Sequence, residues 1–357
     1  MRAFACAVCS SLLGFENSVC VTCGTDQGFS MPRMALVPVP TDGSVVACAN
    51  LGPVGCQWLV DRPGQLCLSC RLTRKRPNDA DSEGLAAWAK TESAKRRLIY
   101  QLLDLVLPVV SLDDDPAGVA FELLSSRDES VITGHADGVV TIDLAEGNDA
   151  KLEAMRLQMG EAYRTMLGHL RHETGHYYWQ VLVQAAVPET GWIRDDGSRR
   201  AWERGEDSLA AFRELFGDER ADYAQSLEKH YDDGPPADWR TEHVSEYATS
   251  HPWEDWAETF AHYLHITDSI QTAAAYGLVV EGADVVDAKA QHLHTRPVEV
   301  PSELPTVEAL IAHWLPLSYA LNASNRSMGH DDLYPFVLSE TVIAKLAFVH
   351  DLVRRTG

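Results

Sequence analysis

The sequence predicts an α+β fold, in which a cysteine-rich N-terminal region and a small β-sheet precede a helix-rich remainder. All 8 cysteines of the 357-residue chain lie before residue 71. After them come short runs rich in β-branched residues, followed by long segments with apolar side chains at helical spacing. At ~100–200 residues per domain, the length allows two or three domains.

Charge and hydropathy exclude several classes of partner. Lysine and arginine number 30 and the acidic residues 52, so the formal net charge is −22. An acidic surface repels phosphates, which disfavours nucleic acid as a partner. No apolar segment approaches the ~20 residues of a membrane span, so we expect no membrane partner. The N-terminal apolar run is too short for a targeting segment, and the expected location is therefore the cytoplasm.

The cysteines fall into two groups of four with metal-binding spacing. The first group reads C-x2-C-x10-C-x2-C and the second reads C-x7-C-x10-C-x2-C. A two-residue spacer lets both thiolates reach one tetrahedral zinc ion, so we predict two structural zinc sites. The predicted ligands are Cys6, Cys9, Cys20, Cys23, Cys48, Cys56, Cys67 and Cys70. Sequential quartets are the simplest pairing, and interleaved pairing stays open. A disulfide framework, the alternative, would require an oxidising compartment.

A basic run follows the last cysteine and comprises Arg71, Arg74, Lys75 and Arg76. Four-cysteine zinc ribbons with basic flanks can bind nucleic acid. We favour instead that these basic residues face solvent in a linker or contact the acidic remainder of the chain. Residues 77–84 are polar and turn-rich, which is typical of a linker. The expected division of the chain is a zinc-ribbon region over 1–76, the linker over 77–84, and a second domain over 85–357.

A helix and three short strands are expected next. Residues 85–107 show an amphipathic helical pattern with a basic patch at residues 95–97. The strands are expected over residues 119–124, 130–133 and 139–144. A hairpin turn over 134–138 joins the last two, and in it His135 either faces a cleft or caps the turn.

The rest of the chain is predicted to be mostly helical. A long helical pattern covers residues 148–182, and helices resume from residue 201 to the end. Breaks that contain proline fall at residues 235–236, 251–252 and 301–305.

The strongest chemical motif is H-E-x-x-H, formed by His172, Glu173 and His176. On a helix, positions i and i+4 share a face, so both imidazoles can bind one zinc ion. Glu173 points to the side, where it can act as general base on a zinc-bound water. The alternative is a pair of core histidines. We expect His169 to support the site rather than to be a fourth ligand, because a catalytic zinc keeps one position open.

A catalytic zinc held by two histidines needs one more protein ligand. Glu254, Glu258 and His262 recur at i, i+4 and i+8, on one face of a helix that Pro252 starts. The alternative is a solvated acidic stripe, against which the flanking tryptophans argue. The spacing alone leaves the choice of ligand open. Asp222 and Tyr223 are candidates to orient a zinc-binding histidine through its far ring nitrogen.

H-E-x-x-H followed far downstream by E-x-x-A-E resembles the gluzincin class of zinc metallopeptidases. Residues 254–260 are particularly similar to the second zinc helix of the anthrax lethal factor type. The resemblance implies that Glu254 is the third zinc ligand and that Glu258 supports the site from outside the ligand set. From its position on the same helical face, we expect His262 to support the site as well. It also places Tyr247, seven residues before Glu254, near the substrate oxyanion.

The whole chain resembles a bacterial family of zinc-binding metallopeptidases with an N-terminal zinc-ribbon region. The similarity runs from Cys6 to about residue 275, and the tail after about residue 300 adds nothing to it. The similar strings include Thr133-Gly-His-Ala-Asp-Gly138, Gly168-His-Leu-Arg-His-Glu173 and His251-Pro-Trp-Glu-Asp-Trp256.

That resemblance implies a helix-rich, zincin-like domain that hydrolyses peptide or protein substrates. The expected cofactors are one catalytic and two structural Zn²⁺ ions. Helical metallopeptidases pair an extended substrate with an edge strand, a part that we expect residues 139–144 to play. A hypothesis from another class is a zinc-ribbon adaptor whose zincin-like domain binds metal without turnover.

Overall fold

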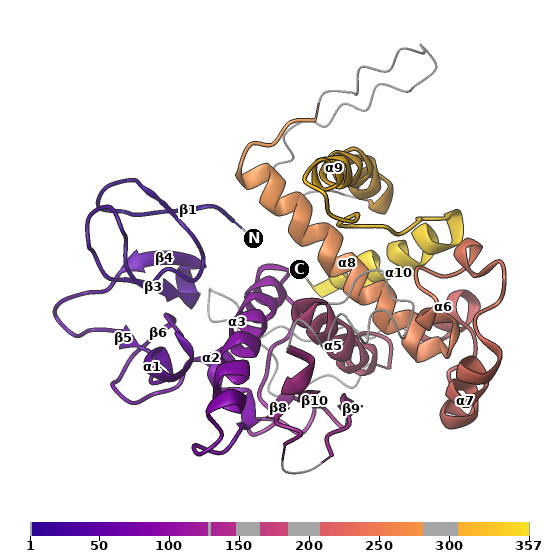
Figure 1. Ribbon diagram of the computed structural model, residues 1–357, viewed down its shortest axis with the longest axis horizontal. Coiled ribbons are helices and arrows are strands. Elements are labelled where there is room, and N and C mark those ends of the chain that lie inside the picture. The colour runs from indigo at the N-terminus through magenta and orange to yellow at the C-terminus, as the bar shows by residue number, and fades with distance from the viewer. Residues whose placement is uncertain (1, 128–129, 148–164, 185–207, 281–305, 357) are drawn as a thin grey trace.

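The computed structural model describes residues 2–127, 130–147, 165–184, 208–280 and 306–356 (Figure 1). The predicted α+β architecture is confirmed, with a ribbon region at one end and a helical body at the other. The helical pattern expected over 148–164 and the break expected at 301–305 lie outside the described residues. Among the residues that are described, every helix is too short or too polar to cross a membrane.

The ribbon region consists of small elements. Its antiparallel pairs are β1 (Phe4–Ala5) with β2 (Leu12–Leu13), β3 (Gln27–Ser30) with β4 (Ala35–Pro38), and β5 (Val46–Ala47) with β6 (Leu59–Val60). Its short helices are η1 (Met31–Arg33), α1 (Leu51–Val54) and α2 (Leu68–Arg71). Elements this short make few backbone hydrogen bonds of their own, so a region of this kind draws stability from bound metal as well as from buried side chains such as Phe29 and Trp58.

A four-stranded sheet follows, in the order β7-β8-β10-β9. Its strands are β7 (Thr73–Lys75), β8 (Ala120–Leu124), β9 (Gly134–Ala136) and β10 (Val139–Asp143). Strand β8 is parallel to β7 and β10, and β9 is antiparallel to β10. The basic run therefore provides a strand, in which Arg74 and Lys75 pair with Glu122 of β8 at 2.5 and 3.0 Å.

Two predictions about this sheet are wrong. The expected strand over 130–133 is instead β9, because the turn lies later than expected: Asp137 and Gly138 have φ of 48° and 78°, as a tight two-residue hairpin turn requires. Residues 139–143 do form a strand, β10, but the edge position expected for it is wrong, because β10 lies inside the sheet and β9 forms its edge.

The helical body is built on α3 (Ser82–Asp104), α5 (Met166–Leu182) and α8 (Pro252–Ala275). Side chains cap all three helices at their N-termini, as Asp81, Thr165 and His251 accept hydrogen bonds from backbone N–H groups. The surrounding elements are η2 (Leu144–Gly147), α6 (Ser208–Phe216), α7 (Tyr223–Asp233), η3 (Trp239–Thr241), η4 (Tyr247–Thr249), α9 (Val307–Ser327) and α10 (Glu340–Thr356). Figure 1 shows α8 between α5 and the C-terminal helices α9 and α10.

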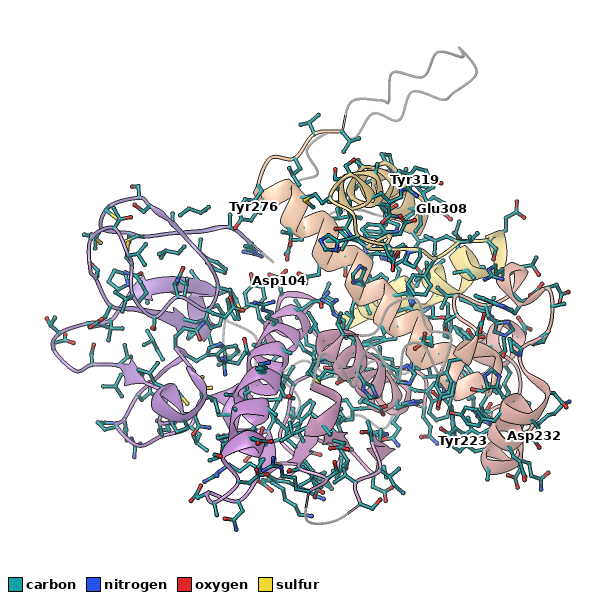
Figure 2. The ribbon with its side chains drawn as sticks, in the orientation of Figure 1. Asp104, Tyr223, Asp232, Tyr276, Glu308 and Tyr319 are labelled. Atoms are coloured by element: carbon teal, nitrogen blue, oxygen red, sulfur yellow. The ribbon has the colours of Figure 1, made fainter. Side chains whose placement is uncertain are left out.

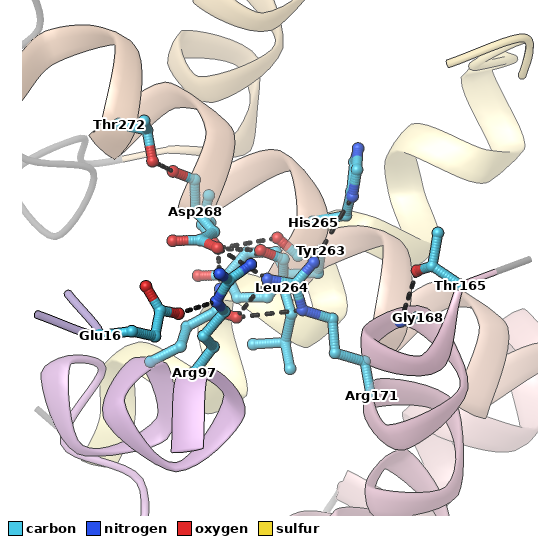
Figure 3. A network of polar contacts seen from close by, with 12 residues as sticks. Glu16, Arg97, Thr165, Gly168, Arg171, Tyr263, Leu264, His265, Asp268 and Thr272 are labelled. Atoms are coloured by element: carbon cyan, nitrogen blue, oxygen red, sulfur yellow. Dashed lines mark hydrogen bonds and ion pairs between the residues drawn. The ribbon is translucent and has the colours of Figure 1, made fainter. Parts of the chain in front are cut away.

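A polar network holds the three central helices together (Figure 3). Arg171 of α5 pairs with Asp268 of α8 at 2.8 Å, and it donates to the side chain of Gln101 of α3 at 2.9 Å. Because Arg171 directly precedes the first histidine of the motif, this network fixes the position of the face of α5 that carries His172 and His176.

Helix α3 also holds the ribbon region, and two of the three cations expected as a basic patch at residues 95–97 are buried. Lys95 is fully buried against Glu92 at 2.8 Å, and Arg96 donates to the Val54 carbonyl of α1 at 3.1 Å. Arg97 pairs with Glu16 of the ribbon region (Figure 3). The three cations therefore join the ribbon region and the sheet to the helical body.

Candidate metal centre

The eight cysteines gather into two clusters, Cys6–Cys9–Cys20–Cys23 and Cys48–Cys56–Cys67–Cys70, as free thiols. Within the clusters, Sγ–Sγ distances include 3.7 Å for Cys6 and Cys23, and 3.6 Å for Cys56 and Cys67. A tetrahedral zinc with Zn–S bonds of ~2.3 Å separates its sulfurs by about 3.8 Å, so the thiols fit zinc. The predicted four-cysteine sites are confirmed, and the pairing is sequential.

A third cluster joins His172 and His176 of α5 to Glu254 of α8. The Nε2 atom of His172 lies 3.0 Å from Oε2 of Glu254, and Nε2 of His176 lies 3.4 Å from Oε1. With bonds of ~2.0–2.1 Å, neighbouring ligand atoms of a tetrahedral zinc lie about 3.3 Å apart. This donor set of two imidazoles and one carboxylate therefore fits a zinc ion that keeps one position open.

The environment of Glu254 favours the ionised carboxylate, which is the form that a metal ligand needs. Burial raises the pKa of its carboxyl, but the charge of His176 and the hydrogen bonds from His172 and His176 outweigh burial and hold the pKa well below its usual range. The carboxylate also accepts a hydrogen bond from the Tyr223 hydroxyl, 2.7 Å from Oε1. Figure 2 shows Tyr223 where α7 approaches the start of α8.

Glu258 and His262 follow Glu254 on α8 without joining the ligand cluster. Oε1 of Glu258 lies 2.7 Å from Nδ1 of His172, so the opposite ring nitrogen is directed at the metal position. His262 instead makes its 2.8 Å hydrogen bond with the Tyr334 hydroxyl of the C-terminal tail. Burial lowers the pKa of His262 to about 4, which keeps this imidazole neutral.

Glu173 is buried beside the metal position and stays ionised. Burial raises the pKa of its carboxyl, but a hydrogen bond from His169 and the charges of the neighbouring histidines lower it below the usual value. Nε2 of His169 lies 3.1 Å from Oε1 of Glu173. His169 therefore contacts the motif's glutamate, which matches the supporting part expected of it.

Two tyrosines lie beside the cluster. The ring of Tyr247 is centred 5.9 Å from that of His172, and the Tyr223 hydroxyl donates a hydrogen bond to Glu254. The prediction that Asp222 or Tyr223 orients a zinc-binding histidine is wrong. Asp222 caps α7 by accepting a hydrogen bond from the backbone N–H of Gln225 at 3.0 Å, and Tyr223 donates its hydrogen bond to Glu254. No sequence signal distinguishes this contact, because Tyr223 and Glu254 lie far apart in the chain.

The position of Glu254 depends on how α8 begins and how closely it approaches α5. Pro252 is in the first turn, where its missing N–H is no loss. A Cβ on Gly175 of α5 would meet Cα of Ala257 at 3.1 Å, and the indole of Trp256 donates to the Gly175 carbonyl at 2.8 Å. A glycine inside the motif therefore lets the two helices come close enough for a shared metal.

The tail after residue 300 also supports the site. Nζ of Lys345 on α10 lies 2.6 Å from Oδ2 of Asp255, and both side chains are buried. Because Asp255 is next to Glu254, this ion pair anchors the ligand-bearing turn of α8.

Comparisons with known proteins agree with this organisation. Residues 84–352 match a family described as "Putative zinc-binding metallo-peptidase", and residues 3–81 match a zinc-ribbon domain. Uncharacterized proteins of Mycobacterium bovis and of two Mycobacterium tuberculosis strains are each 50% identical to this chain over 356 residues, which cover 99% of this chain and 95% of each relative. No solved structure matches. The family match extends into the tail after residue 300, for which sequence reasoning found no similarity.

Proposed function

This chain belongs to a family of zinc-binding metallopeptidases, and from that premise we propose that it hydrolyses peptide bonds with a zinc-activated water, as gluzincins do. The observation that carries the proposal is the convergence of His172, His176 and Glu254 beside a buried, ionised Glu173. A purely structural zinc site is closed by four protein ligands, whereas this cluster offers three among the residues that the structure describes.

In the proposed mechanism, each residue near the metal has a distinct task. Bound zinc would polarise the scissile carbonyl and lower the pKa of a bound water towards ~7. Glu173 takes the proton from the attacking water and passes it to the leaving amine. Glu258 holds the proton on Nδ1 of His172, which leaves Nε2 free to bind the metal.

Tyr247 is the proposed oxyanion donor. Its ring lies beside His172, and burial, followed by the charge of Glu254, raises the pKa of its hydroxyl above the usual range. The hydroxyl therefore keeps its proton at neutral pH and can donate it in a hydrogen bond to the carbonyl oxygen as negative charge develops.

We further propose that the chain holds three zinc ions, one at each cluster. Mass spectrometry under native conditions should give this number for the whole protein. A single ion, with the cysteines recovered as disulfides, would contradict the ribbon sites.

Digestion of a peptide library tests the proposed function. The zinc-loaded chain should cleave library peptides, lose this activity after a chelator removes the metal, and regain it when zinc is restored. A chain that retains the His/His/Glu zinc ion but cleaves nothing would fit the adaptor hypothesis instead.

A further inference from the structure

His135 lies on the edge strand β9 and faces the zinc helix. It pairs across the sheet with Val140, and cross-strand partners share a face; Val140 is fully buried, so His135 is on the inner face of the sheet. Its ring is nearly parallel to that of His176, with 6.3 Å between centroids and 13° between planes. An edge strand thus brings a third imidazole beside a zinc ligand.

The Nε2 atom of His135 is buried and has no hydrogen-bond partner among the described residues. An unpaired buried polar atom is unfavourable unless something else supplies its partner. A ring nitrogen of histidine can donate or accept a hydrogen bond, depending on the tautomer, so Nε2 can bond either an amide N–H or a carbonyl oxygen.

Two other assignments for this nitrogen fit less well. His135 is not in the cluster of mutually close ligand atoms, which within the described part of the chain comprises only His172, His176 and Glu254. A histidine with a purely structural part would be expected to bond backbone groups, as His251 does when it caps α8 and bonds the Ala221 carbonyl at 3.2 Å. A substrate group beside the zinc would give Nε2 the partner that it lacks.

We propose that Nε2 of His135 hydrogen-bonds the main chain of a peptide substrate that lies along β9. This rests on the proposed peptidase function. An edge strand can pair with an extended peptide, and every peptide carries main-chain amide and carbonyl groups at that position. The contact places the scissile bond beside the metal without selecting for particular side chains, and it makes His135 a catalytic residue.

Binding measurements with a chain that cannot turn over test the proposal. The parent is Glu173→Gln, and the probe is the peptide that the wild-type chain cleaves fastest in the library digest. His135→Phe keeps a ring beside His176 but removes the hydrogen bond, and His135→Gln restores a donor and an acceptor. His330→Phe is the matched control, because His330 is exposed and lies in the segment between α9 and α10.

Calorimetry should show peptide binding weakened about 10-fold by His135→Phe, the size of one hydrogen bond. His135→Gln should recover part of the loss, and His330→Phe should bind as the parent does. Zinc content and thermal melting should not change in any of these variants.

Each contrary outcome has its own meaning. Equal binding by His135→Phe and the parent would overturn the assignment of His135 and leave the peptidase function standing. Loss of zinc from His135→Phe would mean that the ring supports the metal site, which also overturns the proposal. Failure of the wild-type chain to cleave any peptide would overturn the proposed function and this contact with it.

Discussion

Glu254 and Glu258 lie one helical turn apart on α8 and meet different atoms of the same histidine. Glu254 is 3.0 Å from Nε2 of His172, whereas Glu258 is 2.7 Å from Nδ1. Glu254 can therefore bind the metal together with His172 while Glu258 orients the imidazole ring. For the two glutamates to exchange these roles, the ring of His172 would have to flip.

The two glutamates should differ in their effect on zinc. Glu254→Ala removes a ligand and should abolish zinc at the His/His/Glu site while both four-cysteine ions remain. Glu258→Ala should weaken that zinc by ~10–100-fold, as is typical when a ligand loses its supporting hydrogen bond. Metal titration of both variants checks this, and the reverse order of effects would contradict the ligand assignment.

Replacing each of the two tyrosines should affect a different property of the site. Tyr223→Phe removes the hydrogen bond to Glu254 and should weaken zinc, whereas Tyr247→Phe should leave zinc unchanged and slow kcat by up to ~10²–10³-fold. Steady-state kinetics at saturating zinc, together with metal affinity, separate the two effects. If Tyr247→Phe kept full kcat while Tyr223→Phe lost it at full zinc occupancy, Tyr223 would be the oxyanion donor.

Sequence spacing predicts the residues of the site that share one helix. His172, Glu173 and His176 follow from the period of α5, and the candidates of α8 follow from its own period. Tyr223 and His135 reach the site only through the tertiary packing of α7 and β9. Sequence spacing therefore left the orientation of His135 open, and it led to the wrong prediction that Tyr223 bonds a histidine. Selecting Glu254 over Glu258 required a family resemblance in addition to spacing.

At the scale of elements, the site depends on the contact between α5 and α8 at Gly175. Replacing a helical glycine with alanine favours the helix itself by ~0.8–1.0 kcal/mol. Here, however, the new Cβ would lie 3.1 Å from Cα and 3.2 Å from O of Ala257. Overpacking of this kind costs ~1–3 kcal/mol and pushes the helices apart.

We therefore expect Gly175→Ala to lower both stability and zinc affinity at the His/His/Glu site, although alanine is the better helix former. Denaturant unfolding and zinc titration measure the two effects. The control is Gly52→Ala in α1, where a Cβ would meet nothing within 4 Å. A gain in stability at Gly175 with unchanged zinc affinity would show that the helix contact tolerates the methyl group.

Helices could be predicted from local sequence signals, whereas the order of the strands could not. The start of α8 was predictable, because Pro252 is a local signal. The amphipathic pattern predicted that α3 exists, but the helix begins at Ser82, three residues before the expected start and inside the expected linker. The edge strand was misplaced, because the order of strands in a sheet depends on pairing between distant segments. The parallel pairing of β7 with β8 brings the basic run into the sheet in the same way.

At the scale of the whole molecule, the ribbon region and the helical body share a core. The ring of Tyr100 on α3 lies 5.0 Å from that of Phe15 and 5.6 Å from that of Phe29, both in the ribbon region. Arg2 adds a 2.8 Å ion pair with Asp104, labelled in Figure 2. Strand β7 begins three residues after Cys70, so the chain passes from the second four-cysteine site directly into the sheet.

This shared core predicts cooperative unfolding. The zinc-loaded chain should melt in one calorimetric transition, and Cys70→Ser should lower the temperature of that whole transition. A loss of ~3 kcal/mol would correspond to a shift of about 4 °C for a chain of this length. A separate early transition for the ribbon region, with the main one unmoved, would show two independent units and support a boundary near residue 76.

The proposed mechanism depends on Glu173 acting as a base at a zinc centre. The most direct test is the rate of peptide hydrolysis by the wild-type chain and by Glu173→Gln at equal, measured zinc content. The variant should keep all its zinc and its melting temperature but lose at least ~10²-fold in turnover. Equal turnover by the two proteins, or hydrolysis that persists after complete removal of zinc, would contradict this mechanism.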